Sequence, residues 1–172
     1  MNSFIYSPRS GKEILAAAPA GTKIYVYSDL CQRVGDPAQI LLSLPSKCII
    51  LLQNPKNMRS GHWIALSRNT RKREMYYFSS YGGKPDVEMS QWVTPEARMR
   101  SGQGRNLIND GLKELCANGW TIFYNDFTYQ KKGDRTATCG IWATAFLHSG
   151  LNPDEFEENH EDEGYYFRHF FN

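Results

Sequence analysis

A cysteine stands where a polar loop passes into an apolar segment, in the stretch TATCGIWATAFLHSG from Thr136 to Gly150. Thr136 or Thr138 can cap a helix that begins near Cys139, and Gly150 with Pro153 marks its end. A cysteine in the first turn of a helix meets unpaired backbone N–H groups and the positive end of the helix dipole, and both favour thiolate over thiol. The same N–H groups can stabilise an oxyanion. From position alone, a buried structural cysteine is the simpler interpretation.

A catalytic cysteine needs a base, and the chain has four histidines. His148 lies on the same predicted helix as Cys139 but about 13 Å away, since each residue of a helix rises 1.5 Å. His160 and His169 lie in the C-terminal tail. His62 follows a glycine at the start of a predicted strand, where scaffolds present catalytic side chains. A structural hydrogen bond at a strand end is the alternative for His62.

The segment after His62 predicts a hairpin of strands 62–68 and 74–80, joined by the polar turn NTRKR. If the turn centres between Thr70 and Arg71, His62 faces Ser79. Cross-strand partners have Cβ atoms about 4.5–5.5 Å apart. Ser79 therefore stands where a group that orients the imidazole would lie.

Composition indicates one globular domain over residues 1–172, with 41% hydrophobic and 22% charged residues. A net charge of +2 is too small to argue for a nucleic-acid or membrane partner. The four cysteines are widely spaced and form no CxxC pair, so we expect free thiols in a reducing compartment, without disulfides, metal or cofactor. No secretory signal opens the sequence, and its longest apolar run, CIILL, is too short to span a bilayer. The expectation is a soluble, intracellular protein that is not secreted.

The order of elements predicts an α+β fold, with a small, mostly antiparallel sheet and helices around it. Expected helices cover residues 11–18, 36–44, 104–120 and 139–150. Expected strands cover residues 47–53, 62–68, 74–80 and 121–130, and the type of segment 22–30 is open. The charge-dense segment 154–163 is typical of a solvated surface.

In this order, GHWIAL, YYFSSYG, Gln130 and TCGIWATAFLH resemble the adenovirus-type maturation proteases. These belong to the superfamily of ubiquitin-like-protein-specific cysteine proteases, and the resemblance is closest to the versions in virophages, polinton-like viruses and other large DNA viruses. It runs from about Lys23 to Gly150. It implies a papain-like, adenovirus-protease-like fold with the nucleophile at a helix N-terminus.

Carried over residue by residue, the resemblance makes Cys139 the nucleophile and His62 its general base. Gln130 matches the glutamine whose side-chain amide forms the oxyanion hole with the backbone N–H of Cys139, and Asn125 is the fallback donor. Trp63 would shape the substrate groove beside the active site, and Gly140 would contact the substrate.

The sequence departs from the family at Ser79, where relatives carry Asp or Glu. A serine hydroxyl can accept a hydrogen bond from imidazole but brings no charge to stabilise the imidazolium. Asp86 or Glu88 could substitute only if the loop after YGGKP folds back. Ser79 therefore implies reduced or differently supported activity.

The leading hypothesis is a cysteine endopeptidase that processes viral capsid or core precursor proteins during virion maturation, in the host cytoplasm or nucleus and in the virion. A deconjugase of ubiquitin-like proteins and a catalytically impaired, peptide-binding scaffold are the alternatives. Some relatives are stimulated by DNA or a peptide. The basic run RNTRKR, from Arg68 to Arg73, could contact DNA or simply be a solvated hairpin tip.

Overall fold

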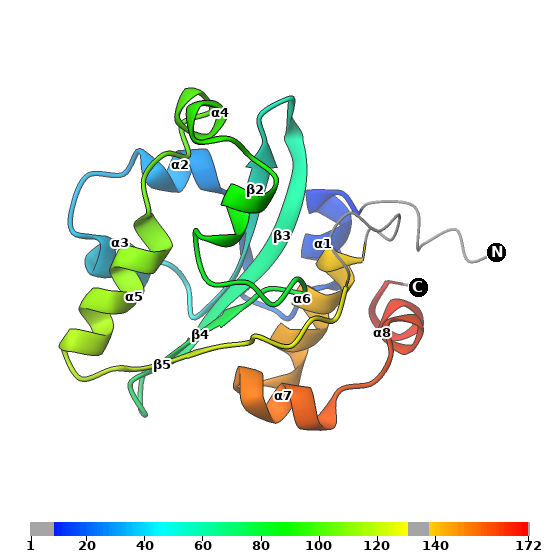
Figure 1. The fold of residues 1–172 in the computed structure, drawn as a ribbon. Helices are drawn as coiled ribbons and strands as arrows, with labels where there is room; N and C mark the ends of the chain where they lie inside the picture. The colour runs from blue at the N-terminus through cyan, green and yellow to red at the C-terminus, as the bar shows by residue number, and fades with distance from the viewer. Residues whose placement is uncertain (1–8, 131–137, 172) are drawn as a thin grey trace.

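The computed structural model describes residues 9–130 and 138–171 (Figure 1). Five strands form one sheet in the order β1-β2-β3-β4-β5. Their bounds are β1 Lys23–Val26, β2 Lys47–Asn54, β3 Asn57–Asn69, β4 Glu74–Phe78 and β5 Thr121–Tyr124. The long central ladders β2–β3 and β3–β4 are antiparallel, and the edge ladders β1–β2 and β4–β5 are parallel. Most paired positions are antiparallel, as predicted, and the α+β class is confirmed.

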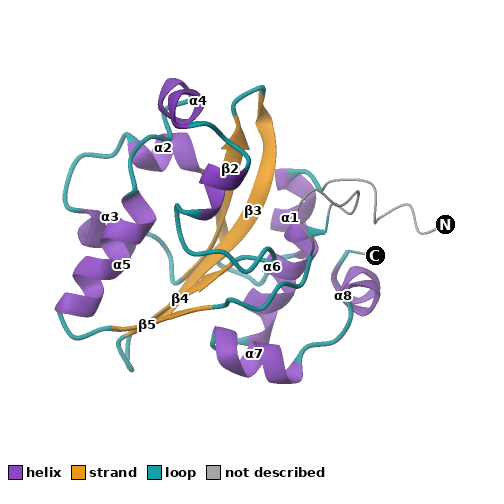
Figure 2. Ribbon diagram, viewed as in Figure 1, coloured by secondary structure: helices purple, strands orange, loops and turns teal. Residues whose placement is uncertain are grey.

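Helices cover both faces of the sheet (Figure 2). On one side lie α2 (Tyr27–Cys31), α3 (Pro37–Ser43), α4 (Pro95–Arg100) and α5 (Leu107–Ala117), with the short 3-10 helix η2 (Glu88–Gln91). On the other side lie α1 (Gly11–Ala17), α6 (Cys139–Ser149), α7 (Pro153–Asn159) and α8 (Glu163–Phe170). Each face therefore has its own hydrophobic core.

The apolar run in β2 supplies both cores, because successive side chains of a strand point to opposite faces. Cys48, Ile50 and Leu52 belong to the core under α2, α3 and α5. Ile49 and Leu51 belong to the core under α1 and α6. The expected strand at residues 47–53 is confirmed, and it is buried on both faces.

Helix α6 lies between the sheet and the helices α1, α7 and α8. Every residue of α6 from Cys139 to Leu147 is buried. Thr138 occupies the N-cap position without a side-chain capping bond to the described part of the chain, and Thr136 lies outside the described residues. Gly150 ends the helix in the left-handed conformation, with φ of 66°. The cysteine at the start of α6 is thus held by a helix with no solvent-facing side before its last turn.

Several expected boundaries were wrong. The segment 22–30 divides into strand β1 and helix α2, and strand β3 begins at Asn57, well before the expected start. Strand β5 ends at Tyr124, so the residues up to Gln130 form a loop. The charge-dense segment contains helix α7, because Asn152 and Glu155 form a capping box and Phe156 is buried.

Gly61 allows β3 to continue into the site. Its φ is +153°, and it lies opposite Gln53, beside the irregularity between Gln53 and Asn54. An added Cβ would lie 2.0 Å from the carbonyl oxygen of Leu52. Only glycine lets these two backbones approach so closely immediately before His62.

We expect Gly61→Ala to lower the free energy of unfolding by about 2 kcal/mol or more, from backbone strain and the clash with the Leu52 carbonyl together. The matched control is Gly35→Ala, because Gly35 also has a positive φ, of +127°, but has open space where a Cβ would stand. Urea unfolding followed by circular dichroism measures both. Equal losses in the two variants would contradict a role for the close approach.

Candidate active site

The residue that follows His62 contacts Cys139 in the structure, although 76 residues lie between His62 and Cys139 in the chain. The backbone N–H of Trp63, the residue after His62, donates to Sγ of Cys139 at 3.5 Å. Strand β3 supplies one partner and the first residue of α6 supplies the other. His62 is 2% exposed and Cys139 is 8% exposed, so both side chains are buried.

His62 meets Ser79 as predicted, but through a different strand register. Ala65 pairs with Phe78, which shifts the hairpin by two residues from the predicted alignment and centres its turn between Arg71 and Lys72. Nε2 of His62 nevertheless lies 2.9 Å from Oγ of Ser79. The ring of Tyr81 stacks on the imidazole, with centroids 3.8 Å apart. The imidazole is therefore fixed in its plane and at one nitrogen.

A carboxylate lies directly behind Ser79. The hydroxyl of Ser79 lies 2.8 Å from Oε2 of Glu88, and the hydroxyl of Tyr77 donates to Oε1 at 2.6 Å. Glu88, Ser79 and Tyr77 are all fully buried. The loop after YGGKP thus folds back, which was the condition for an acid beyond it to reach the site, and Glu88 is the acid that arrives.

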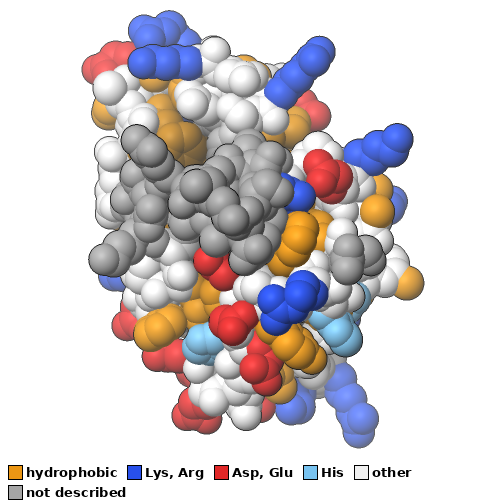
Figure 3. Space-filling view, turned by 90° about the vertical axis from the view of Figure 1, so that its right-hand side faces the viewer, with side chains coloured by type: hydrophobic (Ala, Val, Ile, Leu, Met, Phe, Trp, Pro, Cys, Tyr) orange, Lys and Arg blue, Asp and Glu red, His pale blue; other side chains and the backbone are white. Residues whose placement is uncertain are grey.

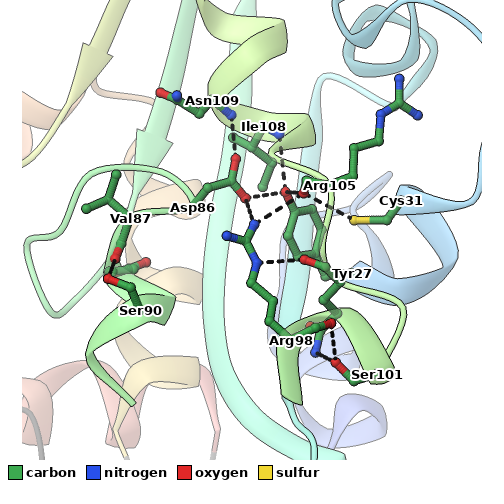
Figure 4. Close-up of polar contacts among 12 residues, drawn as sticks. Tyr27, Cys31, Asp86, Val87, Ser90, Arg98, Ser101, Arg105, Ile108 and Asn109 are labelled. Carbon is green, nitrogen blue, oxygen red and sulfur yellow. Dashed lines mark hydrogen bonds and ion pairs between the residues drawn. The ribbon is translucent and has the colours of Figure 1, made fainter. Parts of the chain in front are cut away.

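Asp86 is engaged elsewhere (Figure 4). Its carboxylate accepts hydrogen bonds from the hydroxyl of Tyr27 and from the backbone N–H of Asn109, and forms an ion pair with Arg98 at 3.0 Å. Burial raises the pKa of Asp86, while these three partners act in the opposite direction. Asp86 therefore anchors the loop to α2, α4 and α5, and leaves Glu88 to face Ser79.

Gln130 lies at the mouth of the same site with an oriented amide. Its Oε1 accepts from the hydroxyl of Ser80 at 2.9 Å, which leaves the Nε2 hydrogens as the donors at this position. Asn125, the fallback donor, is occupied: Oδ1 accepts from the N–H of Ser79, and Nδ2 donates to the carbonyls of Ser79 and Phe127. Of the two amides, Gln130 is the one that lines the same cleft as Cys139.

A cleft of about 260 Å³ opens onto the cysteine. It is lined by Arg9, Ser10, Arg59, Ser60, Gly61, Trp63, Tyr81, Gln130 and Cys139. Trp63 forms part of its wall, and its indole N–H donates to the carbonyl of Arg9. Gly140 does not line the cleft: a Cβ there would lie 2.7 Å from Cδ1 of Ile14, so this glycine lets α6 pack on α1.

Backbone N–H groups at the start of α6 favour the Cys139 thiolate, as expected, but burial opposes them. Burial raises the pKa of the Cys139 thiol to about 11, although the backbone N–H groups of Trp63, Gly140 and Cys139 itself act to lower it. Desolvation disfavours the charged form more than these donors favour it. The resting cysteine is a thiol, and its proton must be removed by a base.

Two residues of the basic run RNTRKR serve the fold itself. Arg68 donates to the carbonyl of Leu44, and Arg73 donates to the carbonyl of Asn118. On the face that carries α8, described acidic, basic and apolar side chains are interspersed (Figure 3). Neither observation favours a DNA-binding surface.

Residues 9–130 and 138–171 contain no group of three or more His, Cys, Asp or Glu side chains placed to hold a metal ion. None of the helices in these ranges combines the length and apolar character that crossing a bilayer requires.

Comparisons with known proteins give two distant likenesses, and no protein-family model matches the chain. Uncharacterized protein V9 of Sputnik virophage is 28% identical over 122 residues, which cover 70% of this chain and 66% of V9. The crystal structure of the ASFV pS273R protease matches with a TM-score of 0.47 and 13% identity, over 88% of this chain and 60% of the protease. The chain thus spans less than two thirds of either protein. These likenesses do not assign a family, so the activity rests on the site itself.

We expect Cys139 to be alkylated by iodoacetamide with a pH dependence displaced above that of an ordinary thiol, which titrates near 8.5. The raised pKa leaves little thiolate at neutral pH, so the rate should still be rising at pH 10. Peptide mass spectrometry separates Cys139 from the exposed Cys116, which serves as the internal control. Full reactivity of Cys139 below pH 7 would instead indicate a preformed thiolate–imidazolium pair.

Proposed function

We propose that the protein is a cysteine endopeptidase in which Cys139 is the nucleophile and His62 the general base. The observation that carries this proposal is the buried hydrogen bond from the backbone N–H of Trp63, the residue after His62, to Sγ of Cys139, which lines an open cleft. The Ser79 hydroxyl holds Nε2 of His62, so Nδ1 is the nitrogen that acts on the thiol. A nucleophile, a base and a group that orients the base are the elements of covalent hydrolysis.

In the first half of the reaction, Nδ1 of His62 takes the thiol proton as Sγ of Cys139 attacks the peptide carbonyl carbon. A C–S bond forms, and the carbonyl π electrons move to the oxygen. The tetrahedral intermediate collapses to a thioester, the C–N bond breaks, and the imidazolium gives its proton to the leaving amine. Deprotonation is coupled to attack, which suits a thiol whose pKa is raised by burial.

The developing oxyanion is stabilised by the Nε2–H of Gln130 and the backbone N–H of Cys139. Water then attacks the thioester carbonyl, His62 takes a proton from that water, and the thiolate leaves and is reprotonated. The net reaction adds one water to one peptide bond.

The substrate we propose is a viral capsid or core precursor protein. The resemblance in the motifs around His62 and Cys139 supports this substrate, as does the likeness to a protein of a virophage. A narrow cleft walled by Trp63 suits small residues, such as glycine, before the scissile bond. A ubiquitin-like tail that ends in diglycine would fit the same cleft, so such a conjugate must be tested as a substrate alongside the precursor.

We expect the purified protein to cleave a subset of a proteome-derived peptide library, with glycine enriched before the cut, as mapped by mass spectrometry. Cys139→Ser should lower kcat/KM by at least about 1,000-fold, because it removes the nucleophile. Cys116→Ser is the matched control and should cleave normally, since Cys116 is exposed and lies far from the cleft.

The comparison of a capsid precursor with a diglycine-linked ubiquitin-like conjugate separates endopeptidase from deconjugase. Binding of library peptides without turnover, in the wild-type protein, would favour the scaffold over any enzyme.

Gln130→Ala should lower kcat by about 100-fold with little change in KM, because an oxyanion donor acts mainly in the transition state. Ser80→Ala should cost much less, since it loosens the amide without removing the donor. Steady-state kinetics on the best peptide from the library measure both. An unchanged kcat for Gln130→Ala would remove this residue from the oxyanion hole.

A further inference from the structure

We infer that Glu88 is a positioning residue of the active site, which sets the tautomer and stabilises the charge of His62 through the hydroxyl of Ser79. This inference rests on the proposed function and extends the Cys139–His62–Ser79 arrangement by one acidic member. The direct acid expected at position 79 is replaced by a serine with a buried glutamate behind it.

We call the chain of hydrogen bonds from His62 through Ser79 to Glu88 the relay. The hydrogen bonds at Ser79 fix which group donates in each step of it. A hydroxyl has one proton to donate and two lone pairs that accept. Three groups surround Oγ: the backbone N–H of Tyr81 at 3.2 Å, Nε2 of His62 at 2.9 Å, and Oε2 of Glu88 at 2.8 Å. The N–H of Tyr81 can only donate, and an ionised carboxylate can only accept. The proton of Ser79 therefore goes to Glu88, and Nε2 of His62 must carry a hydrogen that it donates to Oγ.

This direction leaves His62 in the tautomer that catalysis needs. A neutral imidazole has one N–H, so a proton on Nε2 means an unprotonated Nδ1, which can accept the proton of the Cys139 thiol. If Oε2 of Glu88 were protonated and donated to Oγ, the hydroxyl proton would turn toward Nε2. The ring proton would then sit on Nδ1, and His62 would not be a base toward Cys139.

The structure holds Glu88 for this task. The Tyr77 hydroxyl donates to Oε1, and burial together with the nearby Glu88 raises the pKa of Tyr77 well above its ordinary value, so Tyr77 remains a donor. Gly83 leaves room for the carboxylate, since a Cβ there would lie 2.7 Å from Oε2. The titratable groups that face Glu88 are Tyr77, Tyr81, His62 and Cys139, and Asp86 lies on the same loop.

The relay also supplies the charge that serine lacks. When His62 takes the proton of Cys139, the imidazolium and the Glu88 carboxylate are joined through one hydroxyl inside a buried site. Hydrogen bonds that involve an ion are the stronger kind, so both bonds of the chain tighten as the charge forms.

The first test reads the tautomer directly and does not depend on activity. In 15N-labelled protein, long-range 1H–15N correlation spectra distinguish Nε2–H from Nδ1–H in His62 at a pH where the ring is neutral. We expect Nε2–H in the wild type. In Glu88→Gln the amide N–H₂ should donate to Ser79 and switch His62 to Nδ1–H. A wild-type Nδ1–H tautomer would overturn the inference even if every variant failed to fold.

The matched control is Glu74→Gln. Glu74 also accepts a 2.6 Å hydrogen bond from a tyrosine hydroxyl, that of Tyr76, and lies on the same strand as Tyr77, but at the other end. This variant should keep the wild-type tautomer and the wild-type kcat/KM. A shift of the tautomer in both variants would show a general effect of the substitution and would contradict a specific relay.

The second test is kinetic and uses the peptide identified for the wild type. Glu88→Gln should lower kcat at neutral pH by at least about 100-fold with little change in KM, as a wrong tautomer does in a serine protease triad. The ratio of wild-type kcat to Glu88→Gln kcat should fall as the pH rises toward 10, because a thiol that ionises on its own no longer needs a base. A deficit that is constant with pH would indicate a merely structural role.

Rescue completes the test. Ser79→Asp in the Glu88→Gln background places a carboxylate directly beside His62 and should restore kcat to within about tenfold of the wild type. Failure of rescue in a folded double variant would overturn the relay. If no variant and no wild-type sample cleaves peptides while the tautomers behave as expected, the relay stands and the proposed function fails.

Discussion

A carboxylate that has lost its water must find its hydrogen bonds inside the protein, and this constraint on Glu88 organises the site. Burying an unpaired charge costs far more than any single contact returns. Glu88 meets the requirement with hydroxyls from Tyr77 at the end of β4 and from Ser79 just beyond it. Those two bonds tie the loop after β4 to the strand, and the second of them connects the loop to His62. Removing the carboxylate would therefore alter the fold of the loop and the chemistry of the histidine together.

The loop reaches this position because it is fastened on the opposite side as well. Asp86 is held by groups from α2, α4 and α5. This anchor directs the residues that follow Asp86, including Glu88, toward β4. Two acids that are two residues apart in the chain thus have separate tasks. Asp86 stabilises the loop through an ion pair with Arg98, and Glu88 accepts hydrogen bonds from the hydroxyls of Tyr77 and Ser79.

Several helices and strands could be predicted from the sequence, because a buried element has a recognisable pattern of apolar residues. Strand β2, helix α5 and the glycine that ends α6 all appear where the pattern indicated. The register of the hairpin could not be predicted, since the turn NTRKR offers several centres and its sequence does not choose among them. His62 and Ser79 nevertheless meet, because a side chain reaches a diagonal neighbour as readily as a direct one.

Glu88 shows the limit of reading a site from the sequence. It follows two glycines, a proline and an exposed valine, a context in which an acid is most often solvated. Its burial depends on Gly83, on the anchor at Asp86 and on a tyrosine eleven residues earlier, and none of these leaves a local pattern.

A relayed acid also differs in kind from a direct one. An ionised carboxylate beside the imidazole has no proton to donate, so it always accepts the Nε2 hydrogen. A hydroxyl in the same place can turn and donate its own proton to Nε2 instead. The serine therefore transmits whatever protonation state the glutamate has. In the proposed mechanism such a site works only while the buried acid is ionised, so the hydrogen bond from Tyr77, which stabilises the carboxylate, would support catalysis without touching the histidine.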